Sequence, residues 1–181
     1  MKNAIALITA GLLASFAAAG PTWAASDTTN KPKNATSCPT GKVWDNEKQD
    51  CVAPKKGEID DNSIYEAGRD LANVYRYDEA IDVLQLAANR GDPRILNLLG
   101  YANRKAGRLE VGIGYYREAL AIDPGFTLAR SYYGEALLLK EDVGGAMEQL
   151  VAIEKLCGSQ ACKEYADLAF EIRAYRRLNG G

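Results

Sequence analysis

The sequence of 181 residues contains no histidine, and this absence limits the chemistry that the chain can support. Histidine is the side chain that most often acts as a general base near neutral pH, and it is also the commonest metal ligand. The sequence also lacks the Gly-x-Ser-x-Gly turn of many hydrolases and any glycine-rich loop that would cradle a phosphate. We therefore expect no catalytic residue, no metal site and no cofactor, and we predict that the protein is not an enzyme.

An excess of positive charge is likewise missing. The chain carries 22 basic and 24 acidic residues, which gives a formal net charge of −2, and the basic residues form no stripe along the sequence. Affinity for nucleic acids depends mainly on neutralising phosphates with lysine and arginine. The charge pattern therefore predicts that nucleic acid is not a partner.

Long apolar runs are confined to the start of the chain. Lys2 supplies a positive charge, residues 4–19 are almost entirely apolar, and Thr22 and Ala24 place small residues where a signal peptidase cuts. The run is short for a bilayer span, which needs about 20 apolar residues, although an uncleaved anchor is the alternative. We predict a signal peptide over residues 1–24, export to a bacterial periplasm or secretion, and no stable membrane insertion after cleavage.

Only four cysteines are present, and in an exported chain they are expected to form two disulfides. Three pairings are compatible with the sequence. We favour Cys38–Cys51 and Cys157–Cys162, because each pair brackets a short loop within one segment. The first pair would close a small hairpin inside the polar linker that spans residues 25–60.

From about residue 61 onward the sequence shows an internal repeat. Gly68, Gly100 and Gly134 lie 32 and 34 residues apart. Small residues follow 12 positions after each glycine and large ones 16 positions after it, namely Ala80, Gly112 and Ala146, then Leu84, Tyr116 and Leu150. A glycine inside a helix costs about 1 kcal/mol relative to alanine, so its recurrence indicates that two helices cross closely there. Helices are expected over residues 62–74, 77–90, 94–106, 109–122, 126–139 and 143–156.

This pattern resembles the tetratricopeptide repeat family, whose motif of about 34 residues is a helix-turn-helix. The middle copy carries the resemblance best, with Leu99-Gly100, Gly107, Leu109, Tyr116, Ala119 and Pro124. The resemblance implies an all-α solenoid of three helical hairpins over residues 61–158, followed by a capping helix over residues 159–181. A generic bundle of unrelated hairpins is the alternative. The sequence departs from the family at Gly112, where alanine is usual.

The expected capping helix has one apolar face, which is formed by Tyr165, Leu168, Ala169, Ile172 and Tyr175. This face would cover the last hairpin, and the second disulfide would hold the turn that precedes the helix. A helix that binds a partner is the alternative. Arg176 and Arg177 complement the negative end of a helix dipole, so by themselves they do not indicate a basic site.

In tetratricopeptide arrays the first helices of successive hairpins line a concave groove. If this chain is similar, the groove residues are Tyr65, Arg69, Asn97, Tyr101, Arg104, Lys105, Ser131, Glu135 and Leu138. Tyrosine and arginine are enriched at binding hot spots, so we expect a protein or peptide partner and a scaffold function in the cell envelope. Self-association into a homo-oligomer is also compatible with the sequence. Where some relatives carry a lysine and asparagine clamp for a C-terminal carboxylate, this sequence has other residues, among them Leu98, Leu128 and Tyr132.

The segment at residues 38–52 supports a second hypothesis. Cys38-Pro-Thr-Gly41, Trp44-Asp45 and Cys51 are similar to part of the peritrophin-like chitin-binding motif, in which an aromatic ring stacks on a sugar. The similarity implies binding of a cell-wall or chitin-like carbohydrate through Trp44. The alternative is that Trp44 packs within or onto the helical domain.

Overall fold

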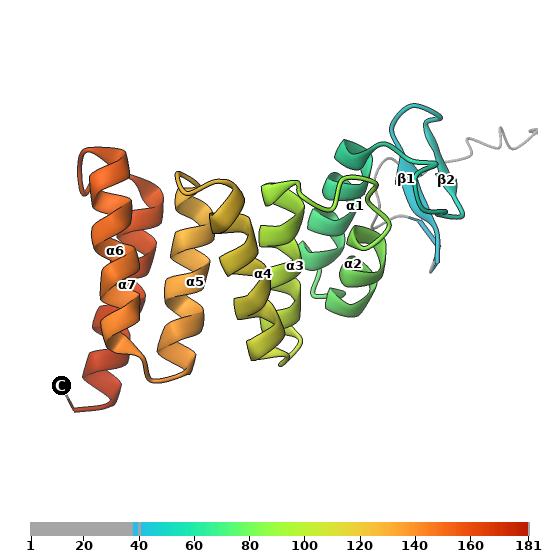
Figure 1. The fold of residues 1–181 in the computed structure, drawn as a ribbon. Coiled ribbons are helices and arrows are strands. Elements are labelled where there is room, and N and C mark those ends of the chain that lie inside the picture. The colour runs from blue at the N-terminus through green and yellow to red at the C-terminus, as the bar shows by residue number, and fades with distance from the viewer. Residues whose placement is uncertain (1–37, 40, 181) are drawn as a thin grey trace, which may run out of the picture. The chain divides into compact units, whose positions relative to one another are not determined.

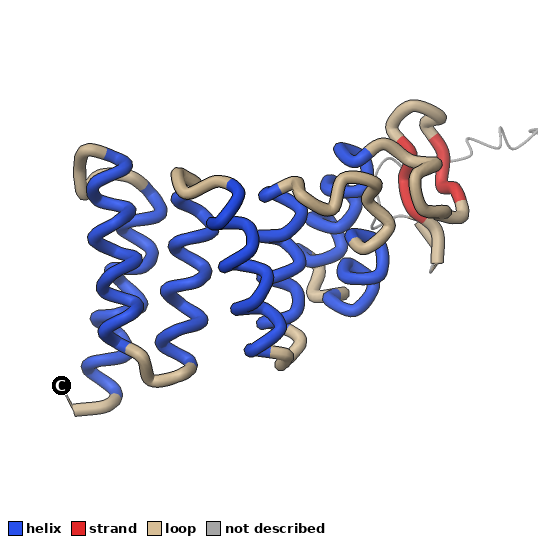
Figure 2. Tube along the Cα trace, in the orientation of Figure 1, coloured by secondary structure: helices blue, strands red, loops and turns tan. Residues whose placement is uncertain are grey.

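The computed structural model describes residues 38–39 and 41–180, and within them it contains seven α-helices and one two-stranded hairpin (Figures 1 and 2). The expected signal peptide over residues 1–24 and most of the first linker lie outside the described residues. None of the helices described combines the length and apolar composition that a membrane span requires.

The segment at residues 38–52 forms a small hairpin that a disulfide closes. Strand β1 (Val43–Asp45) pairs antiparallel with β2 (Asp50–Val52), and Trp44 stands opposite Cys51 in the register. Cys51 is bonded to Cys38 with an S–S distance of 2.03 Å, which confirms the local pairing. A two-stranded hairpin is marginal by itself in water, so the cross-link and packing against the helices account for its order.

Asp45 organises the turn of this hairpin. Its carboxylate accepts hydrogen bonds from the backbone N–H groups of Glu47 and Lys48, both at 2.9 Å, and forms an ion pair of 2.7 Å with the Lys48 ammonium. The side-chain bond from Lys48 is the main cause that lowers the pKa of Asp45. A carboxylate so held contributes stability at neutral pH that is lost as the pH falls through its lowered pKa.

The hairpin packs against the first helix. Val43 and Trp44 belong to the same buried cluster as Ile64 and Leu71, and the Asn46 backbone N–H donates to Ser63 Oγ at 3.2 Å. Trp44 is only 8% exposed. The ring therefore packs onto the helical domain and presents little surface on which a sugar could stack, so the structure does not favour the carbohydrate hypothesis.

The helices follow one another in antiparallel pairs. They are α1 (Asp61–Asn73), α2 (Tyr77–Leu84), α3 (Pro93–Lys105), α4 (Leu109–Ile122), α5 (Thr127–Leu139), α6 (Val143–Cys157) and α7 (Lys163–Leu178). Each pair packs together, and each second helix also contacts the first helix of the next pair. The architecture is the expected tetratricopeptide-like solenoid, with α7 after the third pair and the predicted Cys157–Cys162 disulfide in the turn before α7.

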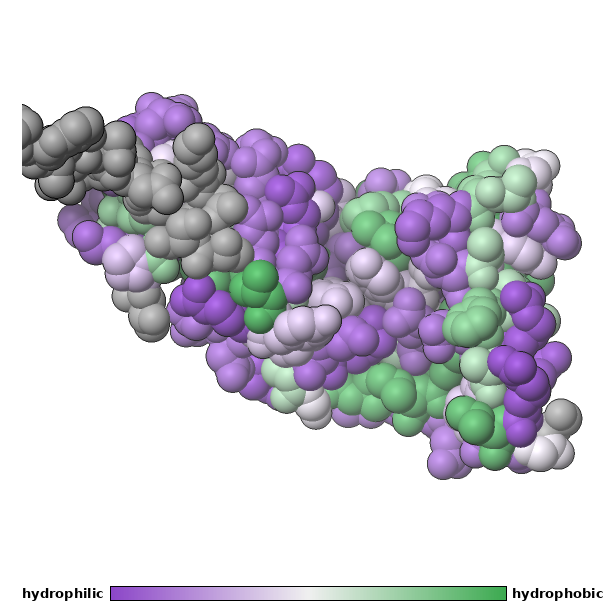
Figure 3. All heavy atoms as spheres, turned by 180° about the vertical axis from the view of Figure 1, so that it is seen from behind, coloured by the Kyte–Doolittle hydropathy of each residue, from purple (hydrophilic) through white to green (hydrophobic). Residues whose placement is uncertain are grey.

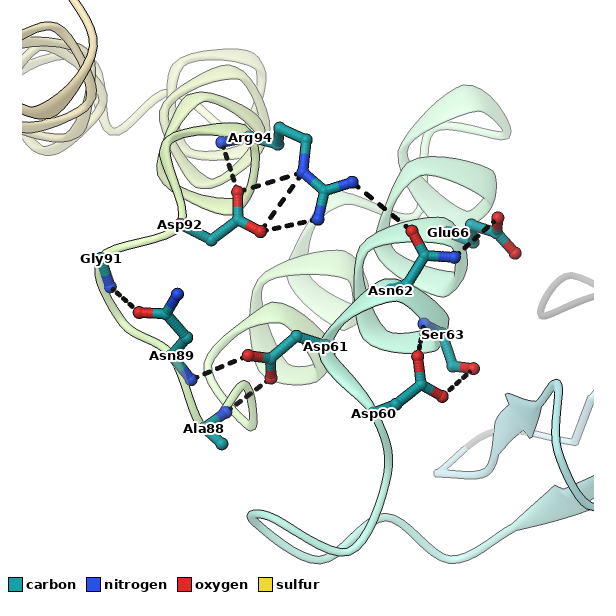
Figure 4. A network of polar contacts seen from close by, with 10 residues as sticks. All are labelled: Asp60, Asp61, Asn62, Ser63, Glu66, Ala88, Asn89, Gly91, Asp92 and Arg94. Atoms are coloured by element: carbon teal, nitrogen blue, oxygen red, sulfur yellow. Dashed lines mark hydrogen bonds and ion pairs between the residues drawn. The ribbon is translucent and has the colours of Figure 1, made fainter.

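One predicted helix is too long, because α2 ends at Leu84 and not near residue 90. The Asp61 carboxylate accepts hydrogen bonds from the backbone N–H groups of Ala88 and Asn89, at 2.8 and 2.9 Å (Figure 4). These N–H groups would donate to carbonyls four residues earlier if the helix continued. The first helix thus holds the chain in a non-helical turn, a tertiary contact that local sequence does not reveal.

A polar network joins the first and second hairpins. Asp92 caps α3 by accepting the Arg94 backbone N–H at 2.8 Å, as the Asp-Pro sequence predicts. The Arg94 guanidinium also bonds the Asp92 carboxylate and reaches Asn62 Oδ1 on α1 at 3.5 Å (Figure 4). The cap of one helix is thereby tied to the preceding first helix.

The repeated glycines lie where helices approach closely. A Cβ atom at Gly68 would lie 2.5 Å from Leu84 Cδ2, and one at Gly100 would lie 2.6 Å from Tyr116 Cε1. Each of these glycines therefore makes room for the large residue 16 positions later on the second helix of its own pair, which confirms the predicted close crossing. In the middle pair the approach is closest, since Gly112 also faces the Gly100 carbonyl.

The third glycine has a different neighbour from the one expected. A Cβ atom at Gly134 would lie 2.6 Å from Leu168 Cδ2, so the space beside this glycine is filled by α7 and not by α6. Leu168 follows Gly134 by 34 residues, which equals the spacing of the preceding repeat. Helix α7 consequently packs on α5 in the manner of a fourth first helix, and Leu168 is the side chain of α7 that fills the space beside Gly134.

Leu168→Ala is expected to lower the free energy of unfolding by about 2–5 kcal/mol, because Leu168 is fully buried and its loss leaves a cavity against Gly134. Urea denaturation followed by circular dichroism measures the change. Leu178→Ala, on the same helix at an exposed position, is the matched control and should stay close to wild type. Equal stability of the two variants would show that α7 is not docked through Leu168.

Candidate functional site

The first helices of the pairs lie next to one another and form one face of the array. Helix α3 contacts both α1 and α5, and α5 contacts α7. All nine residues expected in a groove come from α1, α3 and α5. The structure places four of them at a cleft, Tyr101 beside that cleft, Tyr65 and Arg69 together on α1, and Asn97 and Ser131 in the interior.

A cleft of about 590 Å³ lies between α3, α5 and α7. Four of the expected groove residues line it together: Arg104, Lys105, Glu135 and Leu138. The other lining residues include Leu139, Glu141, Glu171, Tyr175 and Leu178. The contribution of α7 to the cleft was not predicted from the sequence, because that helix was expected chiefly as a cap and no groove residue was expected beyond Leu138.

Arg104 forms the polar base of this cleft. Its Nη2 lies 2.8 Å from Glu135 Oε2, an ion pair by distance although not a well-aligned hydrogen bond. Its Nε donates to the hydroxyl of Tyr116 at 3.3 Å. The guanidinium carbon also lies 5.8 Å from the ring centroids of both Tyr101 and Tyr132, within the range of cation–π attraction. Arg104 therefore ties α3 to both α4 and α5.

Burial shifts the pKa values of the ionisable side chains around Arg104. It raises the pKa of Glu135, and Arg104 offsets only part of that rise. Burial also opposes the charge of Arg104, but Tyr116 and Glu135 outweigh it and leave the pKa of the guanidinium raised. Burial raises the pKa of Tyr116 as well, so its hydroxyl stays protonated near neutral pH. These groups are engaged with one another, which makes Arg104 a structural residue and leaves Lys105 as the basic side chain at the rim.

Tyrosines extend the site along the face. The ring centroids of Tyr101 and Tyr132 are 5.2 Å apart, and those of Tyr77 and Tyr101 are 6.2 Å apart. The Lys105 ammonium lies 5.7 Å from the Tyr101 ring. Tyr77 was not expected in the site, because it meets Tyr101 only through packing between different helices. Tyr132 was expected only as the residue at a clamp position. Together these residues form a continuous aromatic surface beside the cleft.

The remaining expected residues lie away from the cleft. Tyr65 is flanked by the guanidinium groups of Arg69 and Arg94, whose carbons lie 6.0 and 5.1 Å from its ring. Asn97 and Ser131 are buried, and neither lines the cleft. The oxygen of the Asn97 amide has no hydrogen-bond partner among the described residues.

One cluster of potential metal ligands occurs in the described part of the chain, formed by Cys157, Cys162 and Glu164. The two sulfurs are joined in the disulfide. Metal coordination by cysteine requires the thiolate, so this cluster is not a metal site as it stands.

Comparisons with known proteins agree with this architecture. No family model matches the sequence, and no curated protein matches it. Among solved structures, the first tetratricopeptide domain of Spaghetti (RPAP3), bound to the HSP90 peptide SRMEEVD, is 18% identical with a TM-score of 0.58, over 72% of this chain and 100% of that one. The TPR2B domain of yeast Sti1, in a complex with an Hsp70 peptide, is 20% identical with a TM-score of 0.56, over 64% and 98%.

A bacterial example is SycD, a type III secretion translocator chaperone of Yersinia enterocolitica described as an alternative dimer. It is 20% identical with a TM-score of 0.55, over 65% of this chain and 89% of that one. At these identities the likeness shows the fold alone. The chain thus has a tetratricopeptide-like fold, the class of helical-hairpin solenoid that its repeat predicts.

Proposed function

We propose that the protein is a non-enzymatic interaction scaffold of the cell envelope, and that it binds a peptide or protein segment in the cleft between α3, α5 and α7. The observation that carries the proposal is the exposure of two leucines there, 61% for Leu139 and 86% for Leu178. Large apolar side chains that are exposed next to one another in a concave site are typical of interaction surfaces. The envelope location rests on the signal-type sequence at the start of the chain.

The cleft lining indicates what kind of segment would fit. Leu138 forms an apolar part of the lining, and Leu139 and Leu178 are exposed beside it. Charged side chains of both signs are present as well, namely Lys105 on α3, Glu141 after α5 and Glu171 on α7. A partner segment with apolar side chains flanked by charges of both signs would match this surface, with hot-spot energy concentrated in the apolar centre.

The solved relatives support the class of partner and not its identity. The solved complexes of RPAP3 and Sti1 contain an HSP90 peptide and an Hsp70 peptide, which supports a peptide or protein segment as the class of partner. In this chain the positions expected to hold a carboxylate clamp contain Leu98, Leu128 and Tyr132. A chaperone C-terminal tail is therefore not the partner that we propose.

Leu139→Asp combined with Leu178→Asp is expected to weaken partner binding at least about tenfold, because it places charge on the apolar centre of the cleft. A displayed library of peptides from envelope proteins of the host, selected on the wild-type protein, supplies the ligands, and fluorescence anisotropy measures their affinity. Val111→Asp combined with Val151→Asp is the matched control, since both valines are exposed on second helices outside the cleft. Equal affinity of the two double variants would contradict the cleft as the binding site.

The same variants test self-association. If the occupant of the cleft is a second copy of the chain, sedimentation equilibrium should show a dimer that the cleft variant converts to a monomer and the control leaves intact. A dimer that persists in the cleft variant would place self-association elsewhere.

A further inference from the structure

The outer side of α7 carries a patch that the proposed scaffold function does not use. Phe170, Arg173, Arg176 and Arg177, called here the arginine patch, surround a shallow depression of about 380 Å³. Phe170 is 55% exposed, and the three arginines are exposed around it. Seen from behind, the end of the array that holds α6 and α7 places hydrophobic and strongly hydrophilic residues side by side (Figure 3).

Helix spacing brings these residues onto one face. Phe170, Arg173 and Arg177 follow at i, i+3 and i+7, which is one stripe of an α-helix. This stripe is distinct from the apolar side of α7 that carries Leu168 and Ile172, both of which are buried. The exposed phenylalanine is therefore not part of the packing that docks the helix.

The charges of the patch are not neutralised by the protein. Across residues 38–39 and 41–180 none of its three arginines forms an ion pair, whereas exposed Arg94 and Arg108 bond to aspartates. The nearby Asp167 is engaged with Lys163. A helix dipole accounts for two arginines in the last turn, but it does not account for Arg173 or for an exposed phenylalanine among them.

We infer that the arginine patch docks the protein on a membrane surface that contains anionic phospholipids. Guanidinium groups bind phosphates in a bidentate fashion, and their aliphatic stems and the Phe170 ring give the depression an apolar floor. Phenylalanine on the apolar face of a surface-lying helix inserts at the boundary between headgroups and acyl chains, and basic residues next to an anionic leaflet add electrostatic attraction. Docking of this kind is peripheral, and it leaves the cleft residues of α7 free.

A lipid surface matches the patch better than the other polyanions. Nucleic-acid binding needs many phosphate contacts, and the chain as a whole has a net charge of −2. An acidic protein would satisfy the guanidinium groups but supplies no apolar layer for Phe170. Only the membrane interface offers phosphates and an apolar layer at adjoining depths.

Co-sedimentation of the chain from residue 25 onward with vesicles tests the inference. Vesicles of phosphatidylcholine with about a third of phosphatidylglycerol should retain the wild-type protein, and pure phosphatidylcholine vesicles should not. Arg173→Gln combined with Arg177→Gln should weaken retention by roughly fivefold for each arginine removed. Phe170→Ser should also weaken it, although the charge is unchanged. Because all these positions are exposed, circular dichroism should show the fold intact.

Arg117→Gln combined with Lys155→Gln is the control with the same change in charge on other helices, where both residues are exposed and outside any ion pair of the described chain. Its retention should match wild type. The inference is overturned if this control loses as much as the patch variant, or if Phe170→Ser binds as well as wild type. It is also overturned if pure phosphatidylcholine retains the protein equally, or if short duplex DNA or polyglutamate binds more tightly than the anionic vesicles.

Discussion

Gly112→Ala is expected to lower the free energy of unfolding by about 1–3 kcal/mol, because the added methyl group has no room. An ideal Cβ atom there lies 2.8 Å from the carbonyl oxygen of Gly100 and 3.1 Å from the amide nitrogen of Arg104. Both are backbone atoms of the facing helix α3, so the strain cannot be relieved by turning a side chain. Helices α3 and α4 must move apart, which also loosens the contact between Arg104 and Tyr116.

Gly114→Ala is the matched control, two positions along the same helix. A Cβ atom at Gly114 would meet nothing within 4 Å, and the position is exposed. Alanine should therefore stabilise the helix there by about 0.5–1 kcal/mol, since glycine in a helix interior is unfavourable. Urea denaturation of both variants should give opposite signs. A Gly112→Ala protein as stable as the Gly114→Ala protein would show that the two helices do not cross as closely as described.

Glu135→Ala is expected to destabilise the protein by about 3 kcal/mol, because it leaves the buried Arg104 without its counter-ion. The Arg104 side chain is 5% exposed and that of Glu135 is 21% exposed. The rings of Tyr101 and Tyr132 and the Tyr116 hydroxyl remain, but none of them carries a compensating charge near neutral pH. Urea denaturation at neutral pH measures the loss.

A double replacement separates the charge effect from a loss of packing. Arg104→Met combined with Glu135→Leu removes both charges and keeps most of the side-chain volume, so most of the lost stability should return. The single variants Arg104→Met and Glu135→Leu complete a double-mutant cycle, which should show a coupling energy between the two residues. If Glu135→Ala is as stable as the double variant, the ion pair contributes nothing and Arg104 is held by the tyrosines alone.

Most of the helical architecture could be predicted from spacing. The local signals are the glycines at a fixed phase, the small residues 12 positions later and the Asp-Pro cap of α3. Five of the six helices of the array begin and end within a residue or two of the prediction. The exceptions have tertiary causes. Helix α2 ends early because Asp61 binds the backbone of residues 88 and 89, and Gly134 faces Leu168 because α7 fills the place beside α5.

The candidate site could be predicted only in part. The phase of α3 and α5 put Arg104, Lys105, Glu135 and Leu138 on one expected face, and the structure places all four in the lining of one cleft. Helix phase did not reveal that Asn97 and Ser131, which lie on the same helix faces as those four residues, are buried. Their burial depends on how closely neighbouring first helices approach. Nor could the phase of α3 and α5 reveal the wall contributed by α7, because that wall depends on contacts of α7 with α5 and α6.

The sequence by itself determined the class of fold and the middle hairpin with its paired glycines, because backbone propensity and side-chain volume act over a few turns of chain. It favoured the disulfide pairing that the structure shows, because each pair closes a short loop. Tertiary structure alone decided which of the groove residues are accessible, that Trp44 is buried, and that Leu139 and Leu178 border one cleft. The reason is that accessibility arises where several helices meet, and the residues that meet there are separated by whole repeats along the chain.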